Sequence, residues 1–359
     1  MTDLPPTPGP LLVAARTTPT ALWNDSSDLD ELRQSISFGA VGATCNPVIA
    51  YNTIKQNLES WIPRLKSIAE NHPTWGESDI GWQAVKDMSV EAAALLKPIF
   101  DEHNGRNGRL SVQTDPRLHR DAGAIVAQAV EFHEMAENIV VKVPATMIGV
   151  EAIEEATALG VSINVTVSFS VPQAVRTAEA IERGLDRRAA AGHDISRMGP
   201  VVTIMVGRLD DWLKEVVARE KVFIDMSALE WAGIACIKKA HAIFTERGFR
   251  SRVLSAAFRN VNHWASLVGG DLVVSPPFAW QEIINAADYD PVSRIDEPVR
   301  QEYLDELNRL EDFRRAYDED GMTPSEFGSF GPTRKTLRQF LAADADLDAL
   351  VRDILIPAP

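Results

Sequence analysis

The feature that most constrains this chain is a series of eight short, mainly apolar runs, each separated from the next by a longer segment. In the longer segments, apolar residues recur at every third or fourth position, which is typical of helices. Strands that alternate with helices pair in parallel, because each helix returns the chain to the same end of the sheet. Eight such units fit a closed barrel better than an open sheet, so the sequence predicts the α/β class and a (β/α)8 TIM barrel. The expected strands are 20–24, 42–45, 110–114, 139–143, 161–167, 201–206, 252–256 and 272–274.

The segments outside these units set the expected domain organisation. Residues 1–18 are rich in proline and threonine and are predicted to be flexible, whereas residues 19–359 are predicted to form a single barrel domain. Residues 281–359 are charged and amphipathic but show no further strand pattern, so we expect extra helices packed on the barrel, with breaks near 321–324 and 327–332. The acidic run 344–348 is interpreted as a solvent-exposed helix start.

Charge and cysteine content exclude several classes of protein. The chain has 36 Lys and Arg against 51 Asp and Glu, a net charge of −15, so nucleic-acid binding is not expected. Cys45 and Cys236 are too few for a disulfide framework and lack the spacing of a zinc site. The chain shows no signal-peptide pattern and no apolar run of about 18 residues. We therefore expect a cytoplasmic protein that binds no membrane.

Polar residues occupy alternate positions in two of the expected strands. In a barrel, one face of each strand meets the helices and the other meets the lumen, so a polar face opposite an aliphatic one is predicted to line the lumen. The alternative is an edge strand whose polar face meets water. The polar faces comprise Ser162, Asn164, Thr166 and Ser168 in the fifth strand and Ser111, Gln113 and Asp115 in the third.

Lys142 is harder to explain as a solvent-exposed residue, because the residues on both sides of it are apolar. Burial disfavours the charged form of lysine and lowers its pKa, so that a buried amine attacks a carbonyl to form a Schiff base. Such chemistry needs a carboxylate for proton transfer, and Asp25 at the end of the first strand is the candidate. The alternative for Asp25 is a helix cap.

Short motifs at the strand ends resemble those of the transaldolase family. Residues 141–146 are similar to its Schiff-base lysine motif, and residues 42–47 to its second-strand signature, which ends in Asn-Pro. Further similar segments follow in the same order at 164–178, 206–212, 257–260, 274–276 and 333–355. The resemblance covers residues 20–355. It implies a TIM barrel that moves a dihydroxyacetone unit between sugar phosphates without a metal or cofactor.

Carried over position by position, the resemblance implies a set of site residues. Lys142 would form the imine, Asp25 would be the acid and base for carbon–carbon cleavage, and Thr166 would orient a catalytic water. Asn46 and Asn164 would hold the hydroxyl groups of the dihydroxyacetone unit. The implied substrate-binding residues are Asn46, Asn164, Ser168, Thr203, Arg208 and Arg259.

The two arginines are expected to clamp a phosphate, because a guanidinium group binds phosphate through two parallel hydrogen bonds. In an acidic protein the alternative is that Arg208 and Arg259 form surface ion pairs. Thr203 stands where the family has the serine that precedes its phosphate-binding arginine, and Ala257 replaces a second serine. One hydroxyl contact to phosphate is therefore missing, which leaves the end group of the substrate open.

Gln113 departs from the family pattern, which has a water-activating glutamate at this position. An amide cannot take a proton, and the related fructose-6-phosphate aldolases also carry glutamine there. A second hypothesis is therefore an aldolase that releases free dihydroxyacetone, although those enzymes have a tyrosine near the position of Met205 and lack the long tail. A third is an inactive barrel that binds a sugar phosphate. Small sugar phosphates are the expected partners, and the sequence leaves the oligomeric state open, with a homodimer as one option.

Overall fold

The computed structural model describes residues 8–358 and confirms the predicted barrel. Eight parallel strands follow one another around the barrel in chain order, and β8 closes it by pairing with β1. Each predicted strand is present, with ends that differ by at most two residues. The strands are β1 Ala21–Asn24, β2 Ala40–Cys45, β3 Arg109–Gln113, β4 Ile139–Pro144, β5 Ile163–Thr166, β6 Val201–Met205, β7 Arg252–Ala256 and β8 Val273–Ser275.

Helices cover the outside of the barrel, and further helices follow β8, as predicted. The breaks expected in the tail separate α15 from α16 and α16 from α17. The helices are α1 Pro10–Thr17, α2 Leu29–Ser37, α3 Pro47–Gln56, α4 Leu58–Asn71, α5 Glu77–Glu102, the 3-10 turn η1 Pro116–Leu118, α6 Ala122–Met135, α7 Met147–Ala158, α8 Val171–Ala190, α9 Val206–Glu220, α10 Met226–Leu229, α11 Ala232–Arg247, α12 Asn262–Ala265, α13 Phe278–Ala286, α14 Gln301–Leu307, α15 Glu311–Tyr317, α16 Pro324–Phe327 and α17 Gly331–Leu355.

The N-terminal segment differs from the prediction. Residues 1–18 are predicted to be flexible, yet Pro10–Thr17 forms helix α1, in which Leu11 and Ala14 are buried. A proline in the first turn starts this helix, because the missing N–H has no intrahelical partner to lose there. The prediction is therefore wrong for residues 10–17, and residues 1–7 lie outside the described part of the chain. Within residues 8–358, no helix has the length and apolarity needed to cross a membrane.

Several helices begin immediately after a strand, at a side chain that caps them. Asn46 accepts a hydrogen bond from the Ile49 N–H (3.0 Å), and Thr146 accepts one from the Gly149 N–H (3.0 Å). These caps satisfy N–H groups that lack partners in the first helical turn. They keep the connections after the strands short, so the residues at the carboxyl ends of the strands gather at one mouth of the barrel.

Apolar side chains fill the lumen beneath this mouth. Trp23 is the largest of them, and it fits because β2 has a glycine beside it. A Cβ atom on Gly42 would lie 2.4 Å from Trp23 Nε1, so any other residue would displace the indole. Polar residues farther along the strands therefore lie above a packed apolar floor. The floor consists of Ala21, Trp23, Val140, Val201, Leu254, Ala256 and Val273.

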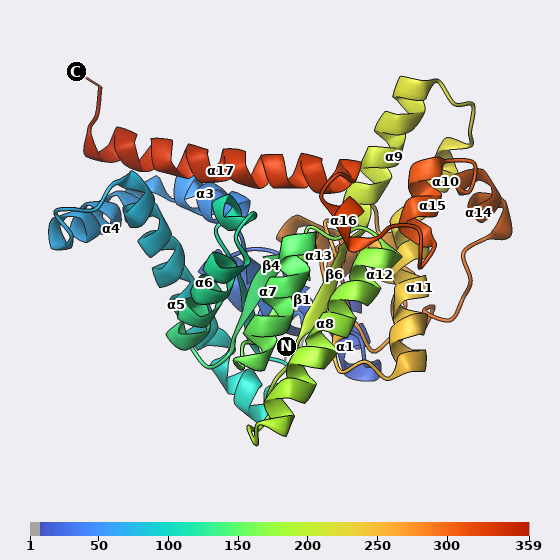
Figure 1. Cartoon of the computed structure of the whole chain (residues 1–359), viewed down its shortest axis with the longest axis horizontal. Coiled ribbons are helices and arrows are strands. Elements are labelled where there is room, and N and C mark those ends of the chain that lie inside the picture. The colour runs from blue at the N-terminus through green and yellow to red at the C-terminus, as the bar shows by residue number, and fades with distance from the viewer. Residues whose placement is uncertain (1–7, 359) are drawn as a thin grey trace, which may run out of the picture.

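Helix α17 runs across the barrel mouth, between α4 on one side and α9 on the other (Figure 1). Arg117 of η1 holds it there through ion pairs with Asp344 (3.1 Å) and Asp348 (3.8 Å), while also pairing with Asp115 (2.6 Å). Asp344 is only 3% exposed and lies in the middle of the helix. The interpretation of residues 344–348 as a solvent-exposed helix start is therefore wrong. Asp344 is buried because it pairs with Arg117, which lies more than 200 residues earlier in the chain.

Candidate active site

Lys142 lies in the barrel lumen, with polar residues on both neighbouring strands. Its Cα pairs in register with Gln113 of β3 and with Asn164 of β5. Residues in register on neighbouring strands point to the same face of a sheet. Lys142 is only 4% exposed, so the predicted inward lysine is confirmed, and the edge-strand alternative is excluded by the closed barrel.

Burial shifts the pKa values of both Lys142 and Asp25 toward the neutral forms of these groups. The pKa of Lys142 is lowered mainly by burial, and the charge of Arg208 lowers it further while Asp25 raises it. The pKa of Asp25 is raised by burial and lowered in part by the charges of Lys142 and Arg208. A lowered amine pKa increases the fraction of Lys142 that is nucleophilic.

Asp25 immediately follows β1, and its N–H donates to the Pro276 carbonyl after β8 (3.3 Å). The helix-cap alternative does not hold, because Asp28 takes that role. Its Oδ1 accepts hydrogen bonds from the N–H groups of Asp30 (2.9 Å) and Glu31 (3.1 Å) at the start of α2. The side chain of Asp25 is therefore free of capping and is coupled electrostatically to Lys142.

A chain of hydrogen bonds fixes Asn164 in the lumen. Its amide Nδ2 donates to Ser111 Oγ (2.9 Å), and its Oδ1 accepts from Thr203 Oγ1 (2.8 Å). All three side chains are buried. This network holds the Asn164 amide at the level of Lys142. The Thr203 hydroxyl is thus hydrogen-bonded to Asn164. Thr203 does not line the separate pocket that contains Arg208 and Arg259.

Three buried polar atoms near the ends of β3 and β5 have no hydrogen-bond partner in the described part of the chain: Gln113 Oε1, Thr166 Oγ1 and Ser168 Oγ. Buried polar atoms rarely stay unpaired, so these atoms are suited to bind a substrate or a water molecule. Val167 lies between two of them with φ +51°, an unfavourable conformation for a β-branched residue. Backbone strain of this kind is common at functional sites.

Two further predicted positions are at the barrel mouth with partners of their own. Asn46 uses its Oδ1 to cap α3, which leaves its amide N–H groups for a ligand. Asp115 was expected on the inward face with Gln113, but β3 ends at Gln113. Asp115 instead accepts from the Arg117 N–H (2.8 Å) at the start of η1 and pairs with the Arg117 guanidinium.

Arg208 and Arg259 lie together at a pocket of about 190 Å3 on the rim of the mouth. Arg208 is in the first turn of α9 and Arg259 follows β7, so the two come from neighbouring barrel units. Burial and the charge of Arg259 lower the pKa of Arg208 to about 10. Arg259 also pairs with Asp211 (2.9 Å), so the surface-ion-pair interpretation holds in part for this residue.

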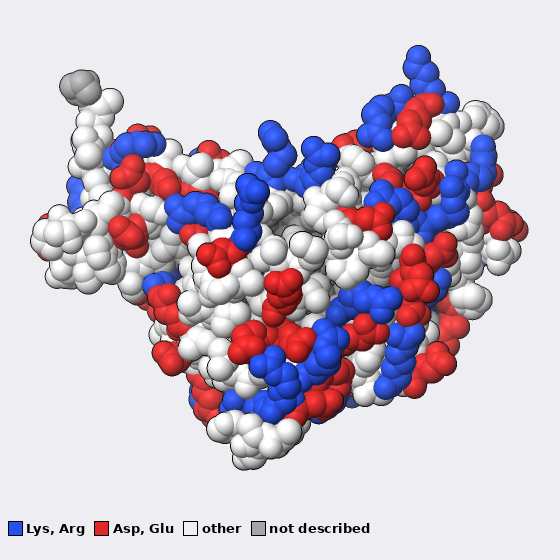
Figure 2. All heavy atoms as spheres, in the orientation of Figure 1, with Lys and Arg blue, Asp and Glu red and all other residues white. Residues whose placement is uncertain are grey.

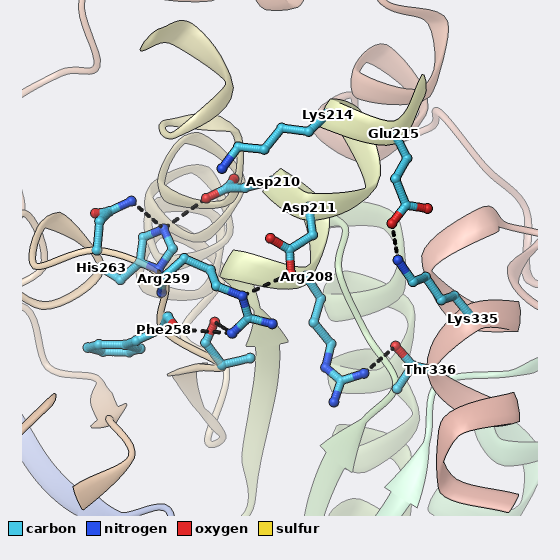
Figure 3. Close-up of polar contacts among 12 residues, drawn as sticks. Arg208, Asp210, Asp211, Lys214, Glu215, Phe258, Arg259, His263, Lys335 and Thr336 are labelled. Atoms are coloured by element: carbon cyan, nitrogen blue, oxygen red, sulfur yellow. Dashed lines mark hydrogen bonds and ion pairs between the residues drawn. The ribbon is translucent and has the colours of Figure 1, made fainter. Parts of the chain in front are cut away.

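The rest of this pocket comes from Asp211 of α9 and from four residues of α17. We call it the anion pocket, and its lining is Arg208, Asp211, Arg259, Pro332, Lys335, Thr336 and Gln339. Arg208 Nη1 donates to Thr336 Oγ1 (3.1 Å), and Lys335 pairs with Glu215 (Figure 3). Arg208 Nη1 also donates to Gln339 Oε1 (2.6 Å). Sequence reasoning missed these α17 residues. The resemblance of 333–355 to a family helix marked the segment, but no pattern within it indicated what it contacts.

Acidic and basic side chains are interspersed over the face seen in Figure 2, but several Lys and Arg side chains gather where α17 approaches α9. A negative ligand would be repelled by most of an acidic surface and attracted here. The site therefore combines a buried amine and carboxylate in the lumen with a cationic pocket at the rim.

Comparisons with known proteins agree with this geometry. The family model described as Transaldolase/Fructose-6-phosphate aldolase matches residues 22–326. The chain is 34% identical to Transaldolase 1 of Streptomyces avermitilis over 181 residues, which are 50% of this chain and 47% of that protein. It is 31% identical to Transaldolase 1 of Streptomyces coelicolor over 251 residues, which are 67% of this chain and 64% of that protein.

A third relative is the transaldolase of Acidothermus cellulolyticus, 30% identical over 240 residues, or 62% of this chain and 60% of that protein. The matched regions thus span from about half to nearly two thirds of the length of these relatives. The family model, in contrast, matches most of the chain: it begins within β1 and includes all of β2 to β8. This chain belongs to the transaldolase/fructose-6-phosphate aldolase family.

Proposed function

We propose that this chain is a transaldolase, an enzyme that moves a dihydroxyacetone unit from a ketose phosphate to an aldehyde through a Schiff base on Lys142. The observation that carries the proposal is the buried Lys142 amine, in register with Gln113 and Asn164 and coupled to Asp25. The family membership and the relatives named transaldolase support the same reaction.

In the proposed reaction, the neutral amine of Lys142 attacks the ketose carbonyl, and loss of water gives an iminium ion. Asp25 takes the proton of the hydroxyl group next to the bond that breaks. The electron pair of that bond moves to the iminium, so an aldehyde leaves and a three-carbon enamine stays on the lysine. The enamine then adds to the acceptor aldehyde, Asp25 returns the proton, and water releases the product.

The surrounding amides and hydroxyls suit the binding of this intermediate. Asn164 is held by Ser111 and Thr203, and Asn46 is held by its helix cap. Their remaining N–H groups are available to the hydroxyl groups of the three-carbon unit. Thr166 and Ser168, whose hydroxyls are buried and unpartnered in the described structure, are suited to hold the water and the substrate.

The anion pocket is proposed to bind the terminal phosphate of the sugar. Arg208 and Arg259 supply planar groups that bind phosphate oxygens in pairs, and Lys335 adds a third positive charge. Asp211 offsets the charge of Arg259, and Glu215 offsets that of Lys335, so Arg208 carries the positive charge that no carboxylate within 4.0 Å in the described structure offsets. The pocket therefore favours an anionic end group and lies apart from the amine that forms the covalent bond.

A second candidate is an aldolase that releases free dihydroxyacetone. Gln113 favours it, because an amide beside the lysine can hold a water molecule but cannot take its proton. The two activities separate kinetically. A transaldolase needs an acceptor aldehyde for turnover, whereas an aldolase consumes the ketose alone.

The test is to incubate the protein with fructose 6-phosphate or with dihydroxyacetone, reduce it with borohydride and locate the adduct by mass spectrometry. We expect a reduced three-carbon adduct on Lys142 alone. Lys238 is the internal control, because burial lowers its pKa to about 8 while its ammonium group donates to backbone carbonyls on the outer face of the barrel. An adduct on Lys238 and not on Lys142, or none with either ketose, would refute the proposal.

A further inference from the structure

A buried acid–histidine pair lies directly behind the anion pocket, and the proposed reaction does not use it. Asp210 and His263 are both fully buried, with Asp210 Oδ2 2.9 Å from His263 Nε2. Asp210 belongs to α9, between Arg208 and Asp211, and His263 belongs to α12. The pair therefore joins the two barrel units that supply the arginines (Figure 3).

The hydrogen bonds of this pair determine which histidine nitrogen carries the proton. The Arg259 N–H donates to His263 Nδ1 (3.1 Å), so Nδ1 is the acceptor and Nε2 carries the hydrogen that it donates to Asp210. The other oxygen of Asp210 accepts from the Gly233 N–H (2.9 Å). A continuous series of hydrogen bonds thus runs from the Gly233 N–H of α11 through Asp210 and His263 to the Arg259 N–H.

The segment that carries Arg259 needs such support. Ala257, two residues earlier, has φ +62°, a conformation that costs energy for a residue other than glycine. The segment also packs closely on α9, since a Cβ atom on Gly207 would lie 2.2 Å from the Ala257 carbonyl oxygen and 2.6 Å from Arg259 Cγ. A strained and closely packed segment keeps its position only when other contacts hold it.

We propose that His263 and Asp210 are positioning residues of the anion pocket: the pair fixes the Arg259 main chain so that its guanidinium group faces the same anion as Arg208. Asp211 holds the Arg259 side chain, because its Oδ2 accepts a hydrogen bond from Arg259 Nε (2.9 Å). One turn of α9 thus carries one arginine and fixes both the main chain and the side chain of the other. The inference rests on the proposed binding of phosphate in this pocket.

Two substitutions at His263 separate its two hydrogen bonds. In His263→Asn the amide reaches as far as Nδ1 and keeps an acceptor for the Arg259 N–H. In His263→Gln the amide reaches as far as Nε2, keeps the contact with Asp210 and leaves the Arg259 N–H without a partner. His241→Gln is the matched control, since His241 lies on α11 at the outer face of the barrel.

The experiment measures the binding of inorganic phosphate to the full chain by titration calorimetry, together with the thermal unfolding of each variant. We expect His263→Gln to weaken phosphate binding about tenfold and His263→Asn about threefold, because His263→Asn keeps the acceptor for the Arg259 N–H and loses only the contact with Asp210. His241→Gln is expected to stay within about twofold of the parent protein. If His263→Gln does not fold, Asp210→Leu/His263→Leu removes both polar groups without leaving a buried charge, and the same loss is expected.

Equal phosphate affinity of His263→Gln and the parent protein would overturn the inference and leave the proposed function intact. Equal weakening in His263→Gln and His263→Asn, in step with their loss of stability, would also overturn it, because the pair would then be merely structural. If the parent protein itself binds no phosphate, the anion pocket of the proposed function fails first, and the positioning role fails with it.

Discussion

Lys142 and Asp25 influence each other's pKa from strands that are three apart in the barrel, without forming a direct ion pair. Each is among the charges that shift the pKa of the other, yet no nitrogen–oxygen distance between these two described residues is within 4.0 Å. The amine and the carboxylate are therefore coupled through their charges without being in contact. A closed ion pair would instead keep the amine protonated and unreactive.

Lys142→Met is expected to abolish the Schiff base and to stabilise the fold. Burying a charged or polar group in place of an apolar one of similar size is costly, so we expect a gain of about 1–2 kcal/mol in the free energy of unfolding at neutral pH. Because the folded-state pKa of Lys142 lies below its unfolded value, the unfolded parent protein binds the extra proton. The gain should therefore shrink as pH rises toward about 10, the usual lysine pKa.

Denaturant unfolding of Lys142→Met and of the parent protein at several pH values measures this difference. A variant less stable than the parent at neutral pH would mean that the lysine holds the barrel together and is not held there for chemistry.

Gln113→Glu is expected to shift the ratio of transfer to ketose cleavage toward transfer. The carboxylate adds a base beside Lys142, where the amide of Gln113 only offers hydrogen bonds. The ratio is obtained from the rate of ketose consumption with and without an acceptor aldehyde. An unchanged ratio would show that the end of β3 does not separate the two activities.

Lys335→Met and Thr336→Val are expected to raise the KM for a phosphorylated acceptor about tenfold, with little change in kcat and none for an acceptor without phosphate. Lys335 supplies a charge to the anion pocket, and Thr336 holds Arg208 Nη1. Arg338→Met, at an exposed position outside the pocket on the same helix, serves as the control. Equal losses with both acceptors would place the defect in folding and not in recognition.

Asp344→Asn is expected to stabilise the protein at pH 8 by about 1 kcal/mol, a modest figure because its partner Arg117 is partly exposed to solvent. Burial and the neighbouring Asp115 raise the pKa of Asp344 to about 6, so the folded state binds a proton that the unfolded state loses near pH 4. The penalty is therefore present above pH 6 and disappears as pH falls toward 4.

Unfolding curves of Asp344→Asn, the parent protein and the exposed control Asp346→Asn at pH 4 to 8 measure the effect. A difference that stays constant over this range would show that the pKa of Asp344 is the same in the folded and unfolded states.

The sequence predicts the features that repeat along the chain better than those that depend on distant contacts. The eight strands and the inward Lys142 follow from local periodicity, because a barrel strand presents alternate residues to lumen and helices. The burial of Asp344 depends on Arg117, and the position of Thr203 depends on Asn164. Such pairings join residues far apart in the chain, and no spacing rule encodes them.

The amphipathic pattern of α17 likewise shows that it packs, but not against what. Only the fold places it over the mouth, where it touches α3, α5 and α9. Helix α1 was missed for a related reason: its eight residues are too few for a clear periodicity beside four nearby prolines.

Because β4 carries Lys142 while α17, outside the barrel repeat, supplies much of the wall of the anion pocket, the proposed covalent step and the proposed recognition of the phosphate depend on separate stretches of polypeptide. An exchange of this one helix between homologues would then alter which aldehydes are accepted and leave the bond-making step intact.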